Sequence, residues 1–248
     1  MAALELEKLT WPEVRAEIEA GRDTVVLAFA AVEQHGHHLP LGTDALLGDE
    51  LSLALAERLD AFRAPTVRVG CSRHHLFFPG TMSIEEETFH ALVADIVRGW
   101  SGHGFRRIVL LPTHGGNFAP LGAALEKLGP LDGVKVVALT DLGLLVEATL
   151  GLGAELGVSA GEGGLHAGQW ETSMMLELHP ELVKMDRAEA GYTGDLESGI
   201  QRFLGEGVQS ISENGVVGDP RKASAEHGRL YLDRLLDLTA ELIERETR

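Results

Sequence analysis

Residues 25–44 of the chain read VVLAFAAVEQHGHHLPLGTD, an apolar run followed at once by a polar segment. The apolar part, residues 25–32, is typical of a buried strand. The polar part, residues 33–44, holds three histidines and two carboxylates. Side chains two positions apart on an extended chain point to the same side, so Glu33 and His35 can face one point. Asp44 can return to that point after a short loop, and we expect a metal site at this strand end.

The composition is that of a soluble globular protein. The chain has 248 residues, 44% of them hydrophobic, with a formal net charge of −17. We expect one domain over residues 1–248. The negative charge argues against binding to nucleic acid or to an anionic membrane surface. The sequence has no membrane-spanning run and no signal-peptide pattern, and its single cysteine, Cys71, fits a reducing compartment, so we expect a cytoplasmic protein.

Strands alternate with helices along the chain. We expect strands over residues 24–32, 64–70, 106–112 and 134–140. Helices are expected over residues 10–20, 44–60, 85–101, 113–128, 166–178 and 221–245, the last capped by Asp219-Pro220. Residues 180–220 are expected to be irregular, as a hairpin or a subunit contact. The alternation predicts an α/β fold, a three-layer α/β/α sandwich around a mainly parallel, four-stranded sheet.

Histidines gather where these strands end. Seven of the 11 lie in strand-end loops or just before a helix: His35, His37, His38, His74, His75, His114 and His166. Open α/β sheets bind ligands outside the carboxyl ends of their strands. Imidazole and carboxylate ligands suit zinc, manganese, iron or cobalt. We therefore expect two ions about 3.5–4 Å apart that share a carboxylate and a nucleophilic water molecule. The candidate residues are Glu33, His35, Asp44, His114, His166 and Glu171.

Other residues near this cluster have two interpretations. Four histidines can face substrate or lie solvated in loops: His37, His38, His74 and His75. Gly115 and Gly116 either form a tight turn or let the backbone approach substrate. Asn117 is expected to cap the following helix, and its position also permits contact with the site. Cys71 is expected to be a small apolar filler and not a nucleophile.

Three motifs together resemble those of the creatininase (creatinine amidohydrolase) family. They are EQHGHHLPLGTD at residues 33–44, THGGN at 113–117 and HAGQWETS at 166–173; FPGT at 78–81 and GDP at 218–220 resemble further parts. The resemblance covers nearly the whole chain in the family's order. It implies a four-stranded parallel sheet between helices, two divalent metal ions per subunit, and hydrolysis of a non-peptide C–N bond in a small molecule. Members are often hexamers, which implies a homo-oligomer.

The resemblance also implies residue roles. It assigns two ligand sets, Glu33, Asp44 and His114 for one ion and His35, Asp44 and Glu171 for the other. Asp44 would be shared by the two ions. His166 looks like the catalytic histidine that protonates the departing nitrogen.

One position departs from creatininase itself, which has a metal-binding glutamate two residues after the histidine that matches His114. Gly116 occupies that position here, so Glu171 would have to supply the ligand. Trp170 is the only tryptophan near a motif, and it can line the substrate or belong to the core. The resemblance therefore implies the metals (zinc, manganese or iron) better than the substrate. A small-molecule amidohydrolase, a peptidase-like maturation factor and a non-catalytic metal-binding or ligand-binding protein all remain open.

Overall fold

The apolar run at residues 25–32 forms the centre of a β-sheet. Strand β2, Thr24–Phe29, has all six residues buried and pairs in parallel with a strand on each side. A computed structural model describes residues 2–247, and all of its paired strands run parallel. The sheet has the order β1-β3-β2-β4-β5, in which β1 is Leu4–Glu5, β3 is Phe62–Arg63, β4 is Arg107–Pro112 and β5 is Lys135–Ala138.

The predicted α/β class is confirmed, but the sheet has five strands where four were expected. The additional strand, β1, has two residues and is too short to show an alternation of apolar and polar side chains. The strand expected at residues 64–70 is wrong, because only an isolated bridge between Phe29 and Val67 follows β3. Pro65 has no N–H to donate to a neighbouring strand, and the regular strand ends before it, at Arg63.

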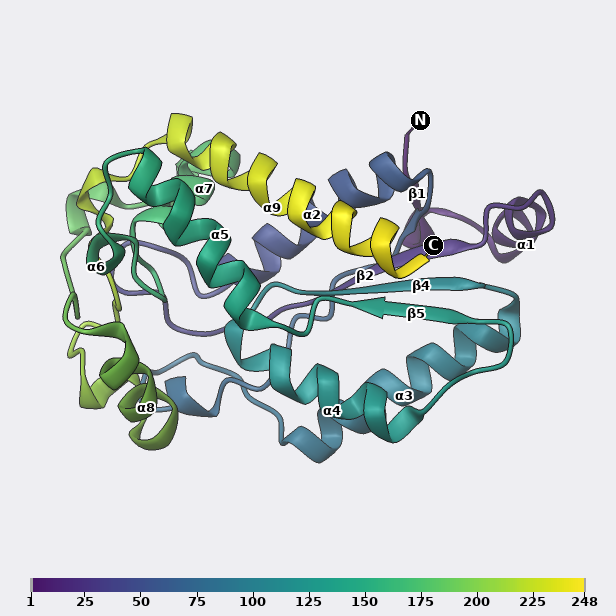
Figure 1. Cartoon of the computed structure of the whole chain (residues 1–248), viewed down its shortest axis with the longest axis horizontal. Helices are drawn as coiled ribbons and strands as arrows, with labels where there is room; N and C mark the ends of the chain where they lie inside the picture. Colours follow the sequence, from purple (N-terminus) through teal and green to yellow (C-terminus); the bar gives the residue numbers. More distant parts are fainter. Residues whose placement is uncertain (1, 248) are drawn as a thin grey trace.

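Helices cover both faces of the sheet (Figure 1). One face carries α1 (Trp11–Glu19), α3 (Glu86–His103) and α4 (Phe118–Leu128), and the other carries α2 (Thr43–Leu59) and α9 (Ala225–Thr247). Val25, Leu27 and Phe29 of β2 pack with α3 and α4. Val26 packs on the opposite face with α2 and α9. This alternation is the two-residue period of a strand with both faces buried.

Four further helices lie toward the carboxyl ends of the strands, on the left of Figure 1. They are α5 (Leu142–Glu155), α6 (Ala160–Gly163), α7 (Gln169–Leu178) and α8 (Leu196–Glu206). Short 3-10 helices cover Leu6–Lys8, Arg73–His75, Gly115–Asn117, Pro180–Leu182, Met185–Arg187, Val208–Ser210 and Pro220–Lys222. Within residues 2–247, no helix combines the length and the apolar character needed to cross a membrane.

Two expectations for the C-terminal third are wrong. Residues 180–220, expected to be irregular, contain the regular helix α8, whose first turn is capped by the carboxylate of Asp195. Asp219 does not cap the final helix. Its carboxylate caps the 3-10 helix Pro220–Lys222, and α9 begins only at Ala225.

Candidate metal centre

Six polar residues from distant parts of the chain meet beyond the carboxyl ends of β2 and β4. Two follow β2, one begins α2, one follows β4 and two lie at the start of α7: in that order Glu33 and His35, Asp44, His114, His166 and Glu171. Their exposed fractions lie between 0% and 7%. Parallel strands bring their carboxyl ends to one edge, where such folds bind ligands. The structure thus brings together every residue for which the sequence predicted a metal-binding or catalytic role.

His114 lies between two carboxylates. Its Nδ1 atom is 3.2 Å from Oε1 of Glu33 and 3.3 Å from Oδ2 of Asp44. Its Nε2 atom is 3.2 Å from the carbonyl oxygen of Cys71. A carbonyl oxygen can only accept, so Nε2 carries a proton and Nδ1 is the atom that a metal would bind. Such a backbone hydrogen bond orients a metal-ligating imidazole.

His35 is oriented in the same way through its other nitrogen. Its Nδ1 atom is 3.1 Å from the carbonyl oxygen of Glu33, and its Nε2 atom is 3.2 Å from Oδ1 of Asp44. Asp44 therefore faces His35 with one carboxylate oxygen and His114 with the other. A carboxylate shared by two ions requires this arrangement, which agrees with the role predicted for Asp44.

The carboxylates of the cluster have only histidines as neighbours of basic character within the described part of the chain. Among residues 2–247, no lysine or arginine pairs with Glu33, Asp44 or Glu171, although all three are buried. In the same part of the chain, both carboxylate oxygens of Glu33 and Nε2 of His35 have no hydrogen-bond partner. Ligand atoms of Glu33, His35 and Asp44 lie within 4.8 Å of one another, as do those of His35, His166 and Glu171. Buried charge requires a partner, and these residues fit divalent cations.

Protons occupy the cluster when no cation is bound. Burial opposes charge on His35, but the carboxylate of Asp44 prevails and raises the pKa of His35 to about 9. His114 is also buried, and Glu33 and Asp44 raise its pKa well above the usual value. Burial raises the pKa of Glu171 to about 7. An ion that binds here would displace such protons, so metal affinity must depend on pH.

His166 turns an unprotonated nitrogen toward the cluster. Its Nε2 atom is 2.6 Å from the carbonyl oxygen of Gln34 and therefore carries the proton. Its Nδ1 atom is 3.7 Å from Oε1 of Glu33. Burial, reinforced by His35, lowers the pKa of His166 well below its usual value. A neutral imidazole in this orientation can accept a proton from the site and return it.

His75 belongs to the cluster more closely than the sequence indicated. It is fully buried, and its Nε2 atom is 3.2 Å from Oε1 of Glu33. Its neighbour His74 is only partly buried and stacks on His114, with 5.6 Å between ring centroids. In the sequence, the only feature that indicated a role for His74 or His75 was their position in a strand-end loop. The turn of the 3-10 helix decides which of the two histidines points inward.

Asn117 does not cap α4, contrary to expectation. Its side chain donates to the carbonyl oxygens of Phe29 and Ala30 and accepts from the N–H of Cys71. It therefore joins the end of β2 to the loop that carries His75. Within residues 2–247 it is not part of the lining of the cleft at this edge.

The other two histidines of residues 33–44 lie apart from the cluster. His38 is buried, with Nε2 2.9 Å from Oγ1 of Thr172, and burial lowers its pKa to about 4. His37 is exposed and lies 3.9 Å from a carboxylate oxygen of Glu189. Within the described part of the chain, neither lines the cleft. Of the three, only His35 contributes to the candidate metal centre.

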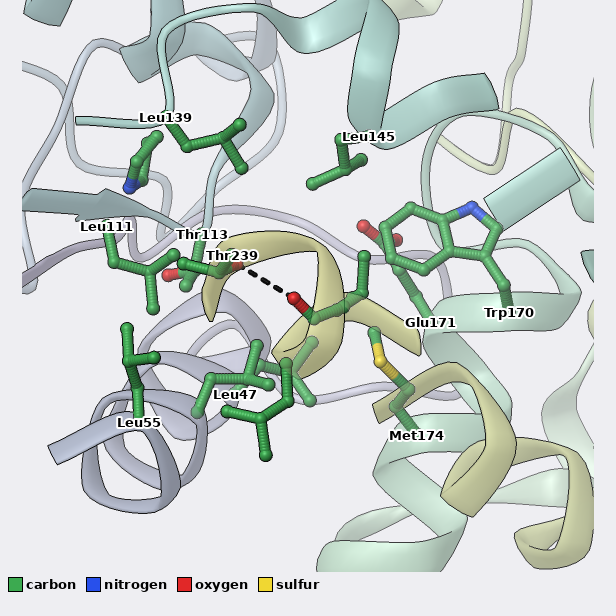
Figure 2. A pocket seen from close by; sticks show the side chains of 14 residues that line it. Leu47, Leu55, Leu111, Thr113, Leu139, Leu145, Trp170, Glu171, Met174 and Thr239 are labelled. Atoms are coloured by element: carbon green, nitrogen blue, oxygen red, sulfur yellow. Dashed lines mark hydrogen bonds between the residues drawn. The ribbon is translucent and has the colours of Figure 1, made fainter. Parts of the chain in front are cut away.

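Trp170 lines a small apolar cavity. Figure 2 shows Trp170 and Met174 on one side of this cavity and Leu55 and Leu111 on the other. Its volume is about 40 Å³, enough for a few water molecules at most. Glu171 also lines it, so the cavity lies directly behind the cluster. Of the two interpretations of Trp170, the structure favours the core.

A cleft of about 990 Å³ opens onto the cluster. Glu33, His114, His166, His74, His75, Gly115 and Gly116 all line it. Its outer wall includes α8, whose Phe203 ring lies 4.8 Å from His74 and 5.4 Å from His75, measured between centroids. The sequence did not predict Phe203, because α8 lies in a segment that carries no motif.

Comparison with known proteins identifies relatives with different described activities. A family model described as creatinine amidohydrolase matches residues 7–243. A mycofactocin precursor peptide peptidase of Mycobacterium ulcerans is 30% identical over 250 residues, covering 96% of this chain and 87% of the relative. A creatinine amidohydrolase of Pseudomonas putida is 34% identical over 201 residues, covering 73% of this chain and 74% of the relative.

Solved structures of creatininases share the fold. A crystal structure of creatinine amidohydrolase (creatininase) matches with a TM-score of 0.83 at 28% identity, covering 98% of each chain. A structure described as creatininase Mn has a TM-score of 0.82 at 28% identity, covering 99% of this chain and 100% of that one. A mutant creatininase of Zn–Zn type has a TM-score of 0.78 at 27% identity over 100% of both chains.

Proposed function

The chain belongs to the creatininase family, and on that premise we propose that it is a metal-dependent amidohydrolase of small molecules. The bond that it hydrolyses is a C–N bond of an amide, a cyclic amide or a formamide. The observation that carries this proposal is the buried set of carboxylates and imidazoles that has no lysine or arginine partner among residues 2–247. Relatives described with manganese and with zinc support divalent metals.

Two ions per subunit, whether zinc, manganese or iron, account for the six-residue cluster. One ion would be held by Glu33, Asp44 and His114, and the other by His35, Asp44 and Glu171. Ions held there would polarise a substrate carbonyl and lower the pKa of a water molecule. The substrate would reach them through the cleft, where Gly115 and Gly116 place no side chain in its way.

His166 supplies the proton transfers. It accepts a proton at Nδ1 from the attacking water molecule and gives that proton to the departing nitrogen. Its Nε2–H stays on the carbonyl oxygen of Gln34, 2.6 Å away, so the ring keeps its orientation through both transfers.

Hydrolysis of a peptide is a second candidate, and the size of the cleft favours it. A volume of about 990 Å³ exceeds what a small planar amide fills. Phe77 and Phe203 line it and offer apolar contact area for side chains of a longer substrate. The peptidase of Mycobacterium ulcerans, which aligns with 96% of this chain, supports the same candidate.

A substrate screen with metal analysis tests these proposals. The purified protein should contain about two equivalents of divalent metal per subunit and hydrolyse members of a panel of amides, lactams, formamides and short peptides. A chelator should abolish this activity, and added metal should restore it. Bound metal without hydrolysis of any panel member would support a binding protein, and activity that survives complete metal removal would contradict the metal mechanism.

The assembly state stays a prediction. The family resemblance implies a homo-oligomer, and a hexamer in particular. Light scattering coupled to size exclusion measures the mass in solution, and a monomer over a wide concentration range would contradict this expectation.

A further inference from the structure

Gln34 stands between the ligand candidates Glu33 and His35 in the sequence, and its side-chain amide is held in one orientation. Its Oε1 atom accepts from the N–H of Gly36 at 2.9 Å, and its Nε2 atom donates to the carbonyl oxygen of Gly215 at 2.9 Å. A backbone N–H can only donate and a carbonyl oxygen can only accept, so these two bonds fix which end of the amide is nitrogen. The side chain is 4% exposed, and water cannot substitute freely for these partners.

The fixed amide determines where His75 carries its proton. The Nε2 atom of Gln34 lies 2.9 Å from Nδ1 of His75 and must donate to it. Nδ1 of His75 is therefore bare, and the ring proton is on Nε2, 3.2 Å from Oε1 of Glu33. Turning the amide over would place oxygen against oxygen at Gly215 and N–H against N–H at Gly36. His75 thus turns its N–H, and not an unprotonated nitrogen that could bind a metal, toward Glu33.

The backbone of the same residue fixes the same tautomer in His166, but with the opposite nitrogen facing Glu33. The carbonyl oxygen of Gln34 accepts from Nε2 of His166 at 2.6 Å, which leaves Nδ1 bare. That bare nitrogen is 3.7 Å from Oε1 of Glu33. A donor on His75 and an acceptor on His166 therefore face the same carboxylate oxygen.

We propose that Gln34 is a positioning residue that fixes the Nε2–H tautomer in His75 through its side chain and in His166 through its carbonyl oxygen. The two rings are oriented differently, so His75 presents its N–H to Glu33 and His166 presents its unprotonated nitrogen. This proposal rests on the proposed function, in which His166 must begin each turnover with a bare Nδ1. His75 presents a neutral N–H beside Glu33 and lines the cleft in which the substrate oxygen would lie. Neither residue can exchange roles with the other while Gln34 is in place.

Part of the segment over residues 180–220 contacts Gln34 and His166. Gly215 has φ +80°, and a Cβ atom at this position would overlap Oε1 of Gln34, so glycine is needed for the close approach. Two residues later, Val217 forms an antiparallel bridge with His166. Residues 215–217 therefore support both halves of the arrangement.

Nuclear magnetic resonance of the zinc-loaded protein tests the proposal without reference to activity. Zinc is diamagnetic, and two-bond correlations between ring protons and ring nitrogens distinguish the two tautomers of each histidine. His75→Gln and His166→Gln variants assign the signals by their disappearance. We expect the proton on Nε2 of both rings in the wild-type protein, and a proton on Nδ1 of His75 would overturn the proposal.

Gln34→Glu is the decisive variant, because it replaces the donor that faces Nδ1 of His75 with an acceptor. We expect a proton on Nδ1 of His75, an unchanged metal content, and a fall in kcat of about 10–100-fold. Gln34→Met only deletes the hydrogen bond, and should move the Nδ1 signal of His75 to the position of a nitrogen without a donor. An unchanged His75 signal in both variants would overturn the proposal, whether or not the protein hydrolyses amides.

Gln169 offers a matched control. It is a buried glutamine whose Nε2 atom donates to Nδ1 of His227 at 2.9 Å, in the contact between α7 and α9. Gln169→Glu should change the His227 signal and leave those of His75 and His166 as they were. A loss of kcat in Gln34→Glu that persists undiminished in the His75→Gln background would also contradict the proposal, because the side chain of Gln34 would then act independently of His75.

Discussion

A Cβ atom on Gly116 would lie 2.5 Å from Nε2 of His114, closer than packed atoms approach one another. It would also overlap the carbonyl oxygen of Cys71, which accepts the proton of that same nitrogen. Glycine is therefore required by the position of His114. The same crowding gives a physical reason for the departure from creatininase itself, because a glutamate at 116 would push the loop aside. In the proposed site, Glu171 supplies the missing carboxylate from α7.

Gly116→Ala should weaken metal binding, because the methyl group displaces His114 from its hydrogen bond to Cys71. A loss of about 10–100-fold in metal affinity is expected for such a disturbance next to a ligand. Gly115→Ala is the matched control, since no atom lies within 4 Å of the position of its Cβ. The metal affinities of the two variants are compared by the amount of metal that each retains after dialysis against a competing chelator. Equal retention in the two variants would mean that His114 does not depend on Gly116.

His166→Ala should abolish turnover and leave the metals in place. Loss of a positioned acid–base group lowers kcat by about 10²–10⁴-fold. His227→Ala is the control, because His227 lies in α9 and bonds through its ring to Gln169, away from the cleft. Elemental analysis and kinetics on the best substrate of the screen provide the two readouts. Loss of metal together with activity would instead make His166 a ligand.

Asp44→Asn should remove the stabilisation that metals give to the fold. For the wild-type protein, an ion at 100 times its Kd adds about 2.7 kcal/mol to the free energy of unfolding. The variant should lose most of this gain, because Asp44 faces both His35 and His114. This metal-dependent gain in stability is measured by thermal unfolding of chelator-treated protein, with and without added zinc or manganese. Asp49→Asn in the same helix, whose carboxylate pairs with Arg63, should lower stability but keep the metal-dependent gain.

Metal binding should release protons, and its affinity should rise with pH. Although burial opposes it, Asp44 raises the pKa of His35 to about 9, so the metal-free cluster is protonated near neutral pH and an entering ion must displace that proton. Affinity should increase as the pH rises toward about 9. Calorimetry in buffers of different ionisation enthalpy counts the protons released.

His38→Gln provides the control for this measurement. Burial lowers the pKa of His38 to about 4, so its ring is already neutral near neutral pH. The variant should therefore release the same number of protons as the wild-type protein. An affinity that does not vary with pH in the wild-type protein would contradict the protonation of His35.

The layers of the fold could be predicted from the sequence because long elements show their period. The strand at residues 25–32 is apolar throughout, and helices such as α2 carry leucines at regular spacing. The short edge strand β1 and the two-residue β3 could not be predicted in this way. Within residues 2–247, β1 pairs only with β3, and β3 pairs with β2, so both depend on contacts with distant segments and not on any local pattern.

The ligand candidates were visible because they stand in dense motifs after strands. The sequence could not show which nitrogen of each ring faces the cluster. Hydrogen bonds to backbone carbonyl oxygens decide this, so His35 turns Nε2 to Asp44 and His114 turns Nδ1 to it. His75 and Phe203 were underestimated or missed for a related reason. Their positions depend on segments that fold back from far along the chain, and the spacing of a motif does not encode such contacts.

The hydrogen bond from Gln34 to Gly215 joins residues 181 positions apart, which separates two events during synthesis. Four ligand candidates, up to His114, leave the ribosome early, and N-terminal parts of a chain begin to fold first. In the proposed arrangement, the Gln34 amide that fixes the tautomer of His75 is held in place only after Gly215 has docked against it. Nascent or truncated chains that end before this point would therefore contain the first four ligand candidates without the contact that fixes His75. Under the proposed function, competence for catalysis would be gained only after residue 217 has been synthesised.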